Sequence, residues 1–178
     1  NAYAAVQVAH CVRRLGAGMN LYALGFLDSR APHRIRLVLR SERLEAVASY
    51  LQAIGWPGDL APVQETLSAF AGPVDRFLLH LDLDRQMPAS LGVELCVLKG
   101  DRPSKMKALL DGLSAAGRCD DEKKEAVLKW EGRCRLPAGG EMQEQDRDWE
   151  RYANYVKVNF RPDGDWLAKT YLFYRKPE

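Results

Sequence analysis

The sequence lacks the long apolar runs and the strong charge imbalance that mark several large protein classes. No apolar run approaches the ~20 residues that a membrane-spanning helix needs, and no signal peptide is recognisable. The net charge is only +2, so the charge balance gives no indication of a nucleic-acid-binding surface. We therefore expect a cytoplasmic protein that binds neither nucleic acid nor membrane. Because the chain begins at Asn1 without Met, we also expect an upstream segment in the gene product.

Cysteines and catalytic signatures are also scarce. The four cysteines, Cys11, Cys96, Cys119 and Cys134, have neither the spacing of a zinc site nor that of a redox pair, so we expect reduced thiols and no metal. There is no Walker loop, no dinucleotide-binding glycine motif, no nucleophile elbow and no HExxH motif. The sequence therefore predicts no cofactor and specifies no reaction.

What the chain does contain is an ordinary globular composition with a repeated order of elements. A helix over 3–15 is followed by a first unit, 21–70, and then by a second unit, 75–132. The elements predicted for the first unit are a strand over 21–27, a turn over 28–32, a strand over 34–40, a helix capped by Ser41 and stopped at Gly55, and a short second helix. The elements predicted for the second unit are strands over 77–84 and 92–98, a helix opened by 101–104 and stopped at Gly117, and a short helix over 120–130. The repeated order holds whether or not the two units share an ancestor.

The end of the chain has a different character. Residues 133–151 are polar and indicate a flexible excursion or a helical insert. A C-terminal hairpin over 155–175 follows, with its turn at Pro162, Asp163 and Gly164. The whole chain, 1–178, is then a single α+β domain with an antiparallel sheet or partial barrel of hairpins covered on its outer face by helices.

Apolar and polar residues alternate in every predicted hairpin. Leu79, Leu81 and Leu83, for example, alternate with His80 and Asp82. Such alternation is typical of an antiparallel sheet with helices on one face only. The polar face is then either exposed to water or, if the sheet curls, the lining of a lumen.

Acidic residues on the polar face are the candidates for chemistry. Asp82, Asp84 and the facing Glu94 are oxygen donors that suit a hard divalent cation, with His80 beside them. The same pattern also fits a solvated strand whose acids pair with basic neighbours, for which Arg34, Arg36 and Lys157 are the candidates. Both interpretations stay open at this point.

Basic and aromatic residues on the same face are the candidates for ligand binding. Guanidinium and ammonium groups match phosphate or carboxylate oxygens, and tyrosine hydroxyls add donors. The candidates are Arg34, Arg36, Lys157, Arg161, Lys169 and Tyr171. They suit a diphosphate or a carboxylated peptide, and an ordinary charged surface is the alternative.

Two resemblances narrow these options. Asp82 and Asp84 in one strand, and Lys169 and Tyr171 near the end, resemble the strand pairs of the ABBA-type (αββα barrel) aromatic prenyltransferases. This resemblance implies a barrel lumen where Arg36, Lys157, Lys169 and Tyr171 face an isoprenyl diphosphate. The chain departs from the pattern, because Glu94 and Cys96 stand where a Lys-x-Tyr is expected and because it has fewer hairpins than a barrel needs.

The second resemblance is to an uncharacterised bacterial family from gene clusters for ribosomally made, modified peptides. The similar segments are 51–58, 110–113 with Cys119, and 155–172. This resemblance implies a peptide-tailoring setting and a biosynthetic partner protein. One hypothesis is therefore a prenyltransferase-like enzyme in which Asp82, Asp84 or Glu94 polarises the nucleophile. The other is a non-catalytic module that captures a precursor peptide or a partner enzyme on the polar face.

Overall fold

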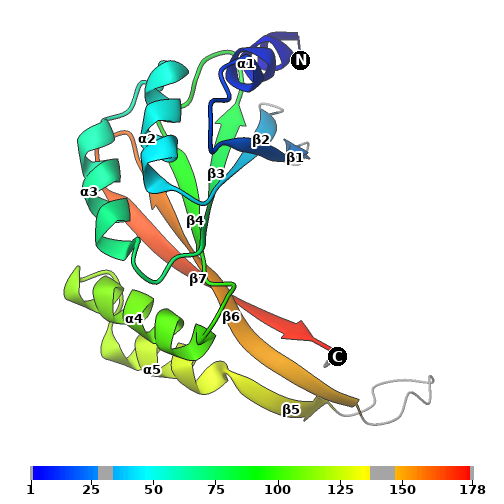
Figure 1. Cartoon of the computed structure of the whole chain (residues 1–178), viewed down its shortest axis with the longest axis vertical. Coiled ribbons are helices and arrows are strands. Elements are labelled where there is room, and N and C mark those ends of the chain that lie inside the picture. Colours follow the sequence, from blue (N-terminus) through cyan, green and yellow to red (C-terminus); the bar gives the residue numbers. More distant parts are fainter. Residues whose placement is uncertain (1, 28–33, 137–146, 177–178) are drawn as a thin grey trace.

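A computed structural model describes residues 2–27, 34–136 and 147–176. In this part of the chain, seven strands form one open antiparallel sheet and five helices lie on one side of it (Figure 1). The strands are β1 (Asn20–Leu27), β2 (Arg34–Ser41), β3 (Arg76–Leu83), β4 (Leu91–Cys96), β5 (Gly132–Leu136), β6 (Arg147–Phe160) and β7 (Trp166–Arg175). The helices are α1 (Ala2–Arg13), α2 (Leu44–Ala53), α3 (Leu60–Phe70), α4 (Arg102–Ala115) and α5 (Asp121–Trp130). None of the helices within these ranges has the length and apolar character to cross a membrane.

The long strand β6 organises one half of the sheet. Strands β1 to β4 pair in chain order, and β4 then pairs with the second half of β6, while β5 pairs with its first half. Strand β7 pairs along the other edge of β6, with a register shift between Ala153 and Tyr155. The β4 and β5 strands therefore share one edge of β6.

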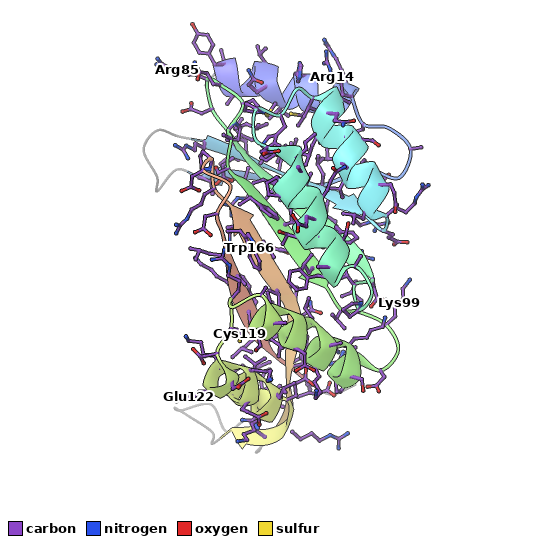
Figure 2. The ribbon with its side chains drawn as sticks, turned by 90° about the vertical axis from the view of Figure 1, so that its left-hand side faces the viewer. Arg14, Arg85, Lys99, Cys119, Glu122 and Trp166 are labelled. Carbon is purple, nitrogen blue, oxygen red and sulfur yellow. The ribbon has the colours of Figure 1, made fainter. Side chains whose placement is uncertain are left out.

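The apolar parity of β2, β3, β4 and the second half of β6 faces the helices, as the alternation predicts, whereas β1 and β7 contain no buried residue. Leu37, Leu79, Val93 and Val156 are fully buried in one core that also takes in the apolar stripes of the helices. Figure 2 looks onto this helical side of the molecule. Burial of this surface is the main favourable term for folding.

The repeated order of elements is confirmed, and so are the two helix stops. Gly55 and Gly117 follow the ends of α2 and α4 with φ angles of 65° and 67°, in the left-handed region that glycine adopts without steric cost. The predicted turn at Asp163 and Gly164 also forms, and Gly164 has a φ of 83°. The turn predicted over 28–32 lies outside the described residues.

Two local predictions differ from the structure. Ser41 ends β2 instead of capping α2: its hydroxyl accepts from the Arg43 N–H and donates to the Arg43 carbonyl, and Arg43 occupies the N-cap position. The polar segment 133–151 contains most of β5 and the start of β6 where a loop or a helical insert was expected. Pairing along β6 satisfies the backbone there, so the tertiary context outweighs the polar composition.

Candidate functional site

The face of the sheet opposite the helices, called the open face below, carries the charged residues of the middle strands. Arg36 lies opposite Asp82 on β3, and Glu94 lies opposite Lys157 on β6. His80 projects from β3 between them, two residues before Asp82. These five residues, Arg36, His80, Asp82, Glu94 and Lys157, are called the open-face cluster.

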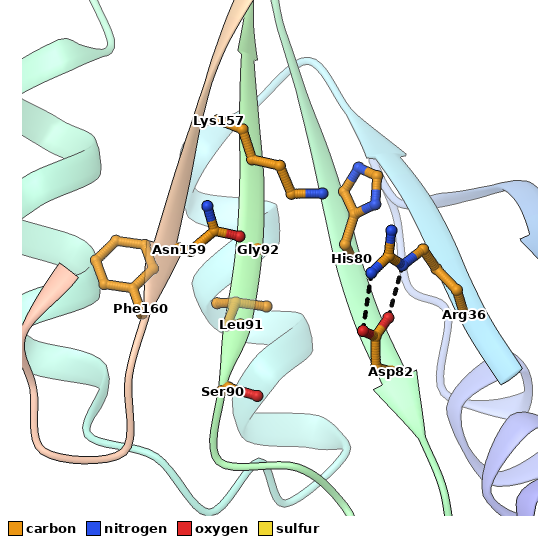
Figure 3. Close-up of a pocket in the computed structure, with 9 residues that line it drawn as sticks. All are labelled: Arg36, His80, Asp82, Ser90, Leu91, Gly92, Lys157, Asn159 and Phe160. Carbon is orange, nitrogen blue, oxygen red and sulfur yellow. Dashed lines mark hydrogen bonds and ion pairs between the residues drawn. The ribbon is translucent and has the colours of Figure 1, made fainter. Parts of the chain in front are cut away.

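Arg36 and Asp82 form the outer part of the cluster. The guanidinium donates from Nε and Nη2 to the two carboxylate oxygens, at 2.6 and 2.8 Å (Figure 3). Both side chains are about a quarter exposed, and hydrogen bonding to Asp82 raises the pKa of Arg36 above its ordinary value. Such a bidentate pair fixes the position of the guanidinium with two of its five N–H groups.

Glu94 forms the inner part, between two basic side chains. Its Oε1 lies 2.9 Å from His80 Nε2 and 3.6 Å from Lys157 Nζ. All three side chains are nearly buried, with 9%, 12% and 8% of their surfaces exposed for Glu94, His80 and Lys157. Burial lowers the pKa of Lys157, and the Glu94 carboxylate opposes that shift. The site therefore holds a buried carboxylate with a histidine nitrogen on one side and an ammonium group on the other.

Gly92 makes the close approach of these groups possible. A Cβ at this position would lie 2.8 Å from Cε of Lys157 and 3.3 Å from Cβ of His80. The lysine therefore crosses β4 over a residue that has no side chain (Figure 3). Beside it is a small cavity of about 80 Å³, lined by Arg36, His80, Asp82 and Lys157 together with Ser90 and Asn159.

A row of aromatic rings continues the open face along β6 and β7. Tyr155 stacks on Tyr171 with 4.7 Å between the ring centres, and Tyr152 stacks on Phe173 at 5.6 Å. Tyr155 and Phe173 are also in contact, at 5.7 Å, so the four rings form one aromatic row. Burial and the Glu94 charge raise the pKa of Tyr155 to about 12, so its hydroxyl stays protonated at neutral pH.

The open face is not uniformly polar. Val38, Leu78 and Cys96 form a second, small apolar cluster, and Tyr155 packs against it. These residues share the parity of the charged ones, since Val38 lies opposite His80 and Leu78 lies opposite Glu94. The alternation in the sequence does not predict this patch.

The structure brings together some of the residues that the sequence singled out. Arg36, Asp82, Glu94 and Lys157 are in the cluster, Lys169 lies opposite Lys157 with its side chain exposed, and Tyr171 is in the aromatic row. The remaining candidates lie away from the cluster. Arg34 is exposed at the start of β2, Asp84 follows the last residue of β3, and Arg161 pairs with Asp165 in the β6–β7 turn at 3.5 Å.

Three residues with a place in this site were not identified from the sequence. His80 was considered only as a metal ligand or a structural residue, and Gly92 and Tyr155 were not considered as site residues. Tyr155 stands two residues before Lys157, and the parity of β6 alone would have assigned it to the polar face. Gly92 carries no such signal, because its role depends on which side chains lie across it.

The metal hypothesis gains no support from the geometry. Within the described ranges, no group of three or more His, Cys, Asp or Glu side chains is placed to hold a metal ion. Asp82 binds Arg36, and His80 lies against Glu94. The cysteines are free thiols, and Cys11 and Cys96 are buried.

Comparison with known proteins does not extend this description. No protein-family model, no curated protein and no solved structure matches the chain. The function has to be argued from the open face itself.

Proposed function

We propose that the open face binds an isoprenyl diphosphate and transfers the prenyl group to a peptide or small-molecule nucleophile, with Glu94 as the proton acceptor. The observation that carries this proposal is a buried carboxylate between His80 and Lys157, next to a positioned arginine and a row of stacked tyrosines. Cations, a proton acceptor and aromatic faces are the three parts that such a transfer requires.

The diphosphate would be held by the basic members of the face. In the described part of the chain, the hydrogen bonds of Arg36 use two of its N–H groups, and the others are donors for phosphate oxygens. Lys157 adds a charge at the cavity, and the exposed Lys169 opposite it adds another. Asp82 keeps the guanidinium oriented while the anion binds.

In the transfer step, an atom of the nucleophile forms a bond to C1 of the prenyl group as the C1–O bond breaks. The electron pair of that bond leaves with the diphosphate, and the proton of the nucleophile passes to Glu94. The faces of Tyr155 and Tyr171 stabilise positive charge on the allylic carbons by cation–π interaction. Because the pKa of Tyr155 is about 12, its ring stays neutral and does not compete as a base.

A second candidate is a binding module for a precursor peptide or a partner enzyme. It is favoured by the openness of the sheet and by β1, an edge strand without a charged residue, in which Leu21, Tyr22, Leu24 and Phe26 are exposed. An extended peptide can add to such an edge through backbone hydrogen bonds. Both candidates fit modified-peptide biosynthesis, and they differ in whether chemistry follows binding.

Calorimetric titration with dimethylallyl and geranyl diphosphate tests the enzyme proposal. We expect micromolar binding by the native chain and a loss of about tenfold or more in the double variant R36A/K157A, since each side chain contributes charge-assisted contacts. The matched control is R43A/K129A, which removes one Arg from the N-cap of α2 and one Lys from α5, both outside the cluster. Absence of binding at high micromolar concentration would contradict the proposal.

Incubation with a diphosphate and candidate peptides, followed by mass spectrometry, separates the two functions. A mass gain of one prenyl group that is lost in E94Q supports the transferase. Peptide binding that R36A/K157A weakens, without any diphosphate binding, supports the module.

A further inference from the structure

A second cavity, of about 510 Å³, lies between the start of α4, the end of α5, and strands β5 and β6. This region is at the lower end of the molecule in Figure 1. The cavity is lined by three arginines, Arg102, Arg133 and Arg151, together with Tyr152 and two glutamates. None of these residues belongs to the open-face cluster, although Tyr152 is the end of the aromatic row.

Two of these arginines bury N–H groups for which the described residues supply no acceptor. In the part of the chain that the structure describes, Nε and Nη2 of Arg102 and Nε of Arg151 are buried without a hydrogen-bond partner. Both guanidinium groups are held by aromatic rings: Arg102 lies 4.6 Å from the ring centre of Tyr152, and Arg151 lies 5.1 Å from that of Trp130. Leaving a charged donor buried and unsatisfied costs on the order of 1–3 kcal/mol or more, so an acceptor for these nitrogens, which the described residues do not supply, would be stabilising.

The glutamates of the cavity make other contacts. Glu150 accepts from Nε of Arg175 on the neighbouring strand β7, and Oε1 of Glu131 accepts from the Ala153 N–H at 3.4 Å. The Arg175 guanidinium lowers the pKa of Glu150, which is therefore ionised at neutral pH. The lining thus holds three arginines against two carboxylates, and Glu150 also interacts electrostatically with Arg102 and Arg133, so the arginines outnumber the acids by one.

The Arg36–Asp82 pair of the open-face cluster shows which group suits the unpaired Nε and Nη2 of Arg102. In Arg36 the same two nitrogens, Nε and Nη2, bind the two oxygens of Asp82 at 2.6 and 2.8 Å. That edge of a guanidinium matches two oxygens of one carboxylate or phosphate group. We propose that this cavity is a binding site for a small oxyanionic ligand: the Arg102 side chain turns so that Nε and Nη2, which are buried in this structure, bind the ligand's carboxylate or phosphate group, with added charge from Arg133 and Arg151.

The proposal is independent of the function assigned to the open face. Its test is NMR titration of the native chain with inorganic phosphate and, separately, with acetate at constant ionic strength, following the arginine Nε–H signals. We expect one or both anions to shift the Arg102 signal in a saturable way. Saturation by phosphate alone identifies a phosphate group, and saturation by acetate alone identifies a carboxylate. If neither anion shifts the Arg102 signal, the proposal is wrong.

The variant R102K makes the test more specific, because lysine keeps the positive charge but lacks the two parallel N–H donors of the guanidinium group. We expect it to bind the anion about tenfold more weakly or worse, since a bidentate contact is lost. The matched control is R118K, because Arg118 also lies over an aromatic ring, Trp166 at 4.8 Å, while its Nη2 already donates to Asp165 at 2.7 Å. Unchanged binding in R118K and weaker binding in R102K support the site, and equal affinity in R102K and the native chain would overturn it.

Discussion

The two faces of the sheet bury different kinds of side chain, although they belong to the same strands. The helix-covered face buries aliphatic residues such as Leu79 and Val156, whereas the open face buries Glu94 and Lys157, each about 7% exposed. Burying a charged pair is generally no more stabilising than burying apolar residues of the same volume. The comparison teaches that stability comes mainly from the first face, and under our proposal the charges of the second serve binding or chemistry.

The largest expected loss of stability comes from a substitution in the core under the helix-covered face. Leu79 and Leu78 are neighbours that point to opposite faces, with exposures of 0% and 9%. We expect L79A to lower the free energy of unfolding by about 4 kcal/mol, since it leaves a cavity in the main core. L78A removes the same atoms from the small open-face patch and should cost about 1–2 kcal/mol. Urea unfolding measures both, and a larger loss in L78A would reverse the comparison.

The next effect concerns the buried charges. E94Q leaves Lys157 buried beside a neutral amide, so we expect a loss of about 3 kcal/mol. The double variant E94L/K157M replaces both charges by apolar side chains of similar size and should recover most of that loss. Denaturant unfolding at pH 7 checks both variants. If the double variant is less stable than E94Q, the pair stabilises the fold and our contrast between the faces fails.

The loss of stability in acid should reveal the contribution of one structural carboxylate, Asp75, which lies outside the open-face cluster. Asp75 accepts the N–H groups of Leu98 and Lys99 and pairs with Lys105, and these contacts outweigh its burial and lower its pKa from 3.8 to about 2. Its contribution, about 2 kcal/mol, is therefore present above pH 4 and is lost as the pH falls toward 2. In D75N that part of the acid dependence should be missing from urea titrations. An unchanged acid dependence in D75N would show that Asp75 is not the group responsible.

The smallest effect on stability is expected at Gly92. In G92A the new methyl group displaces the end of the Lys157 side chain, which is flexible, so the free energy of unfolding should change by less than about 1 kcal/mol. Diphosphate binding should weaken by about fivefold or more because the ammonium group leaves the cavity. Calorimetry and urea unfolding on the same sample separate these two effects. If G92A binds the diphosphate as tightly as the native chain, the position of the Lys157 ammonium group does not contribute to diphosphate binding.

Much of the fold follows from local patterns in the sequence. Alternation along β2, β3 and β4 predicted which side chains face the helices, and Gly55 and Gly117 marked helix ends. Strand β5 was missed because its pairing partner, not its own composition, makes it a strand. Local signals of this kind depend on side-chain parity and backbone conformation, which the sequence carries directly.

The site was predictable only in part. The polar parity identified Arg36, Asp82, Glu94 and Lys157 and predicted the basic residues as counter-charges of the acids. It did not predict which acid each one meets, because strand register decides that Arg36 meets Asp82 and that Glu94 meets Lys157. The Arg102 cavity could not be predicted, since it depends on the start of α4 and the end of α5 meeting β5 and β6 in space. Such contacts are set by tertiary packing and leave no periodic signal.

The most direct test of the central claim, that function lies on the open face, is a map of where geranyl diphosphate binds. Backbone and side-chain NMR signals of the native chain should be followed as this ligand is added. We predict saturable shifts that concentrate at Arg36, His80, Lys157 and Tyr171, with little change at the buried aliphatic residues of the other face. Shifts confined to the helical side, or no saturable shifts at all, would contradict the account.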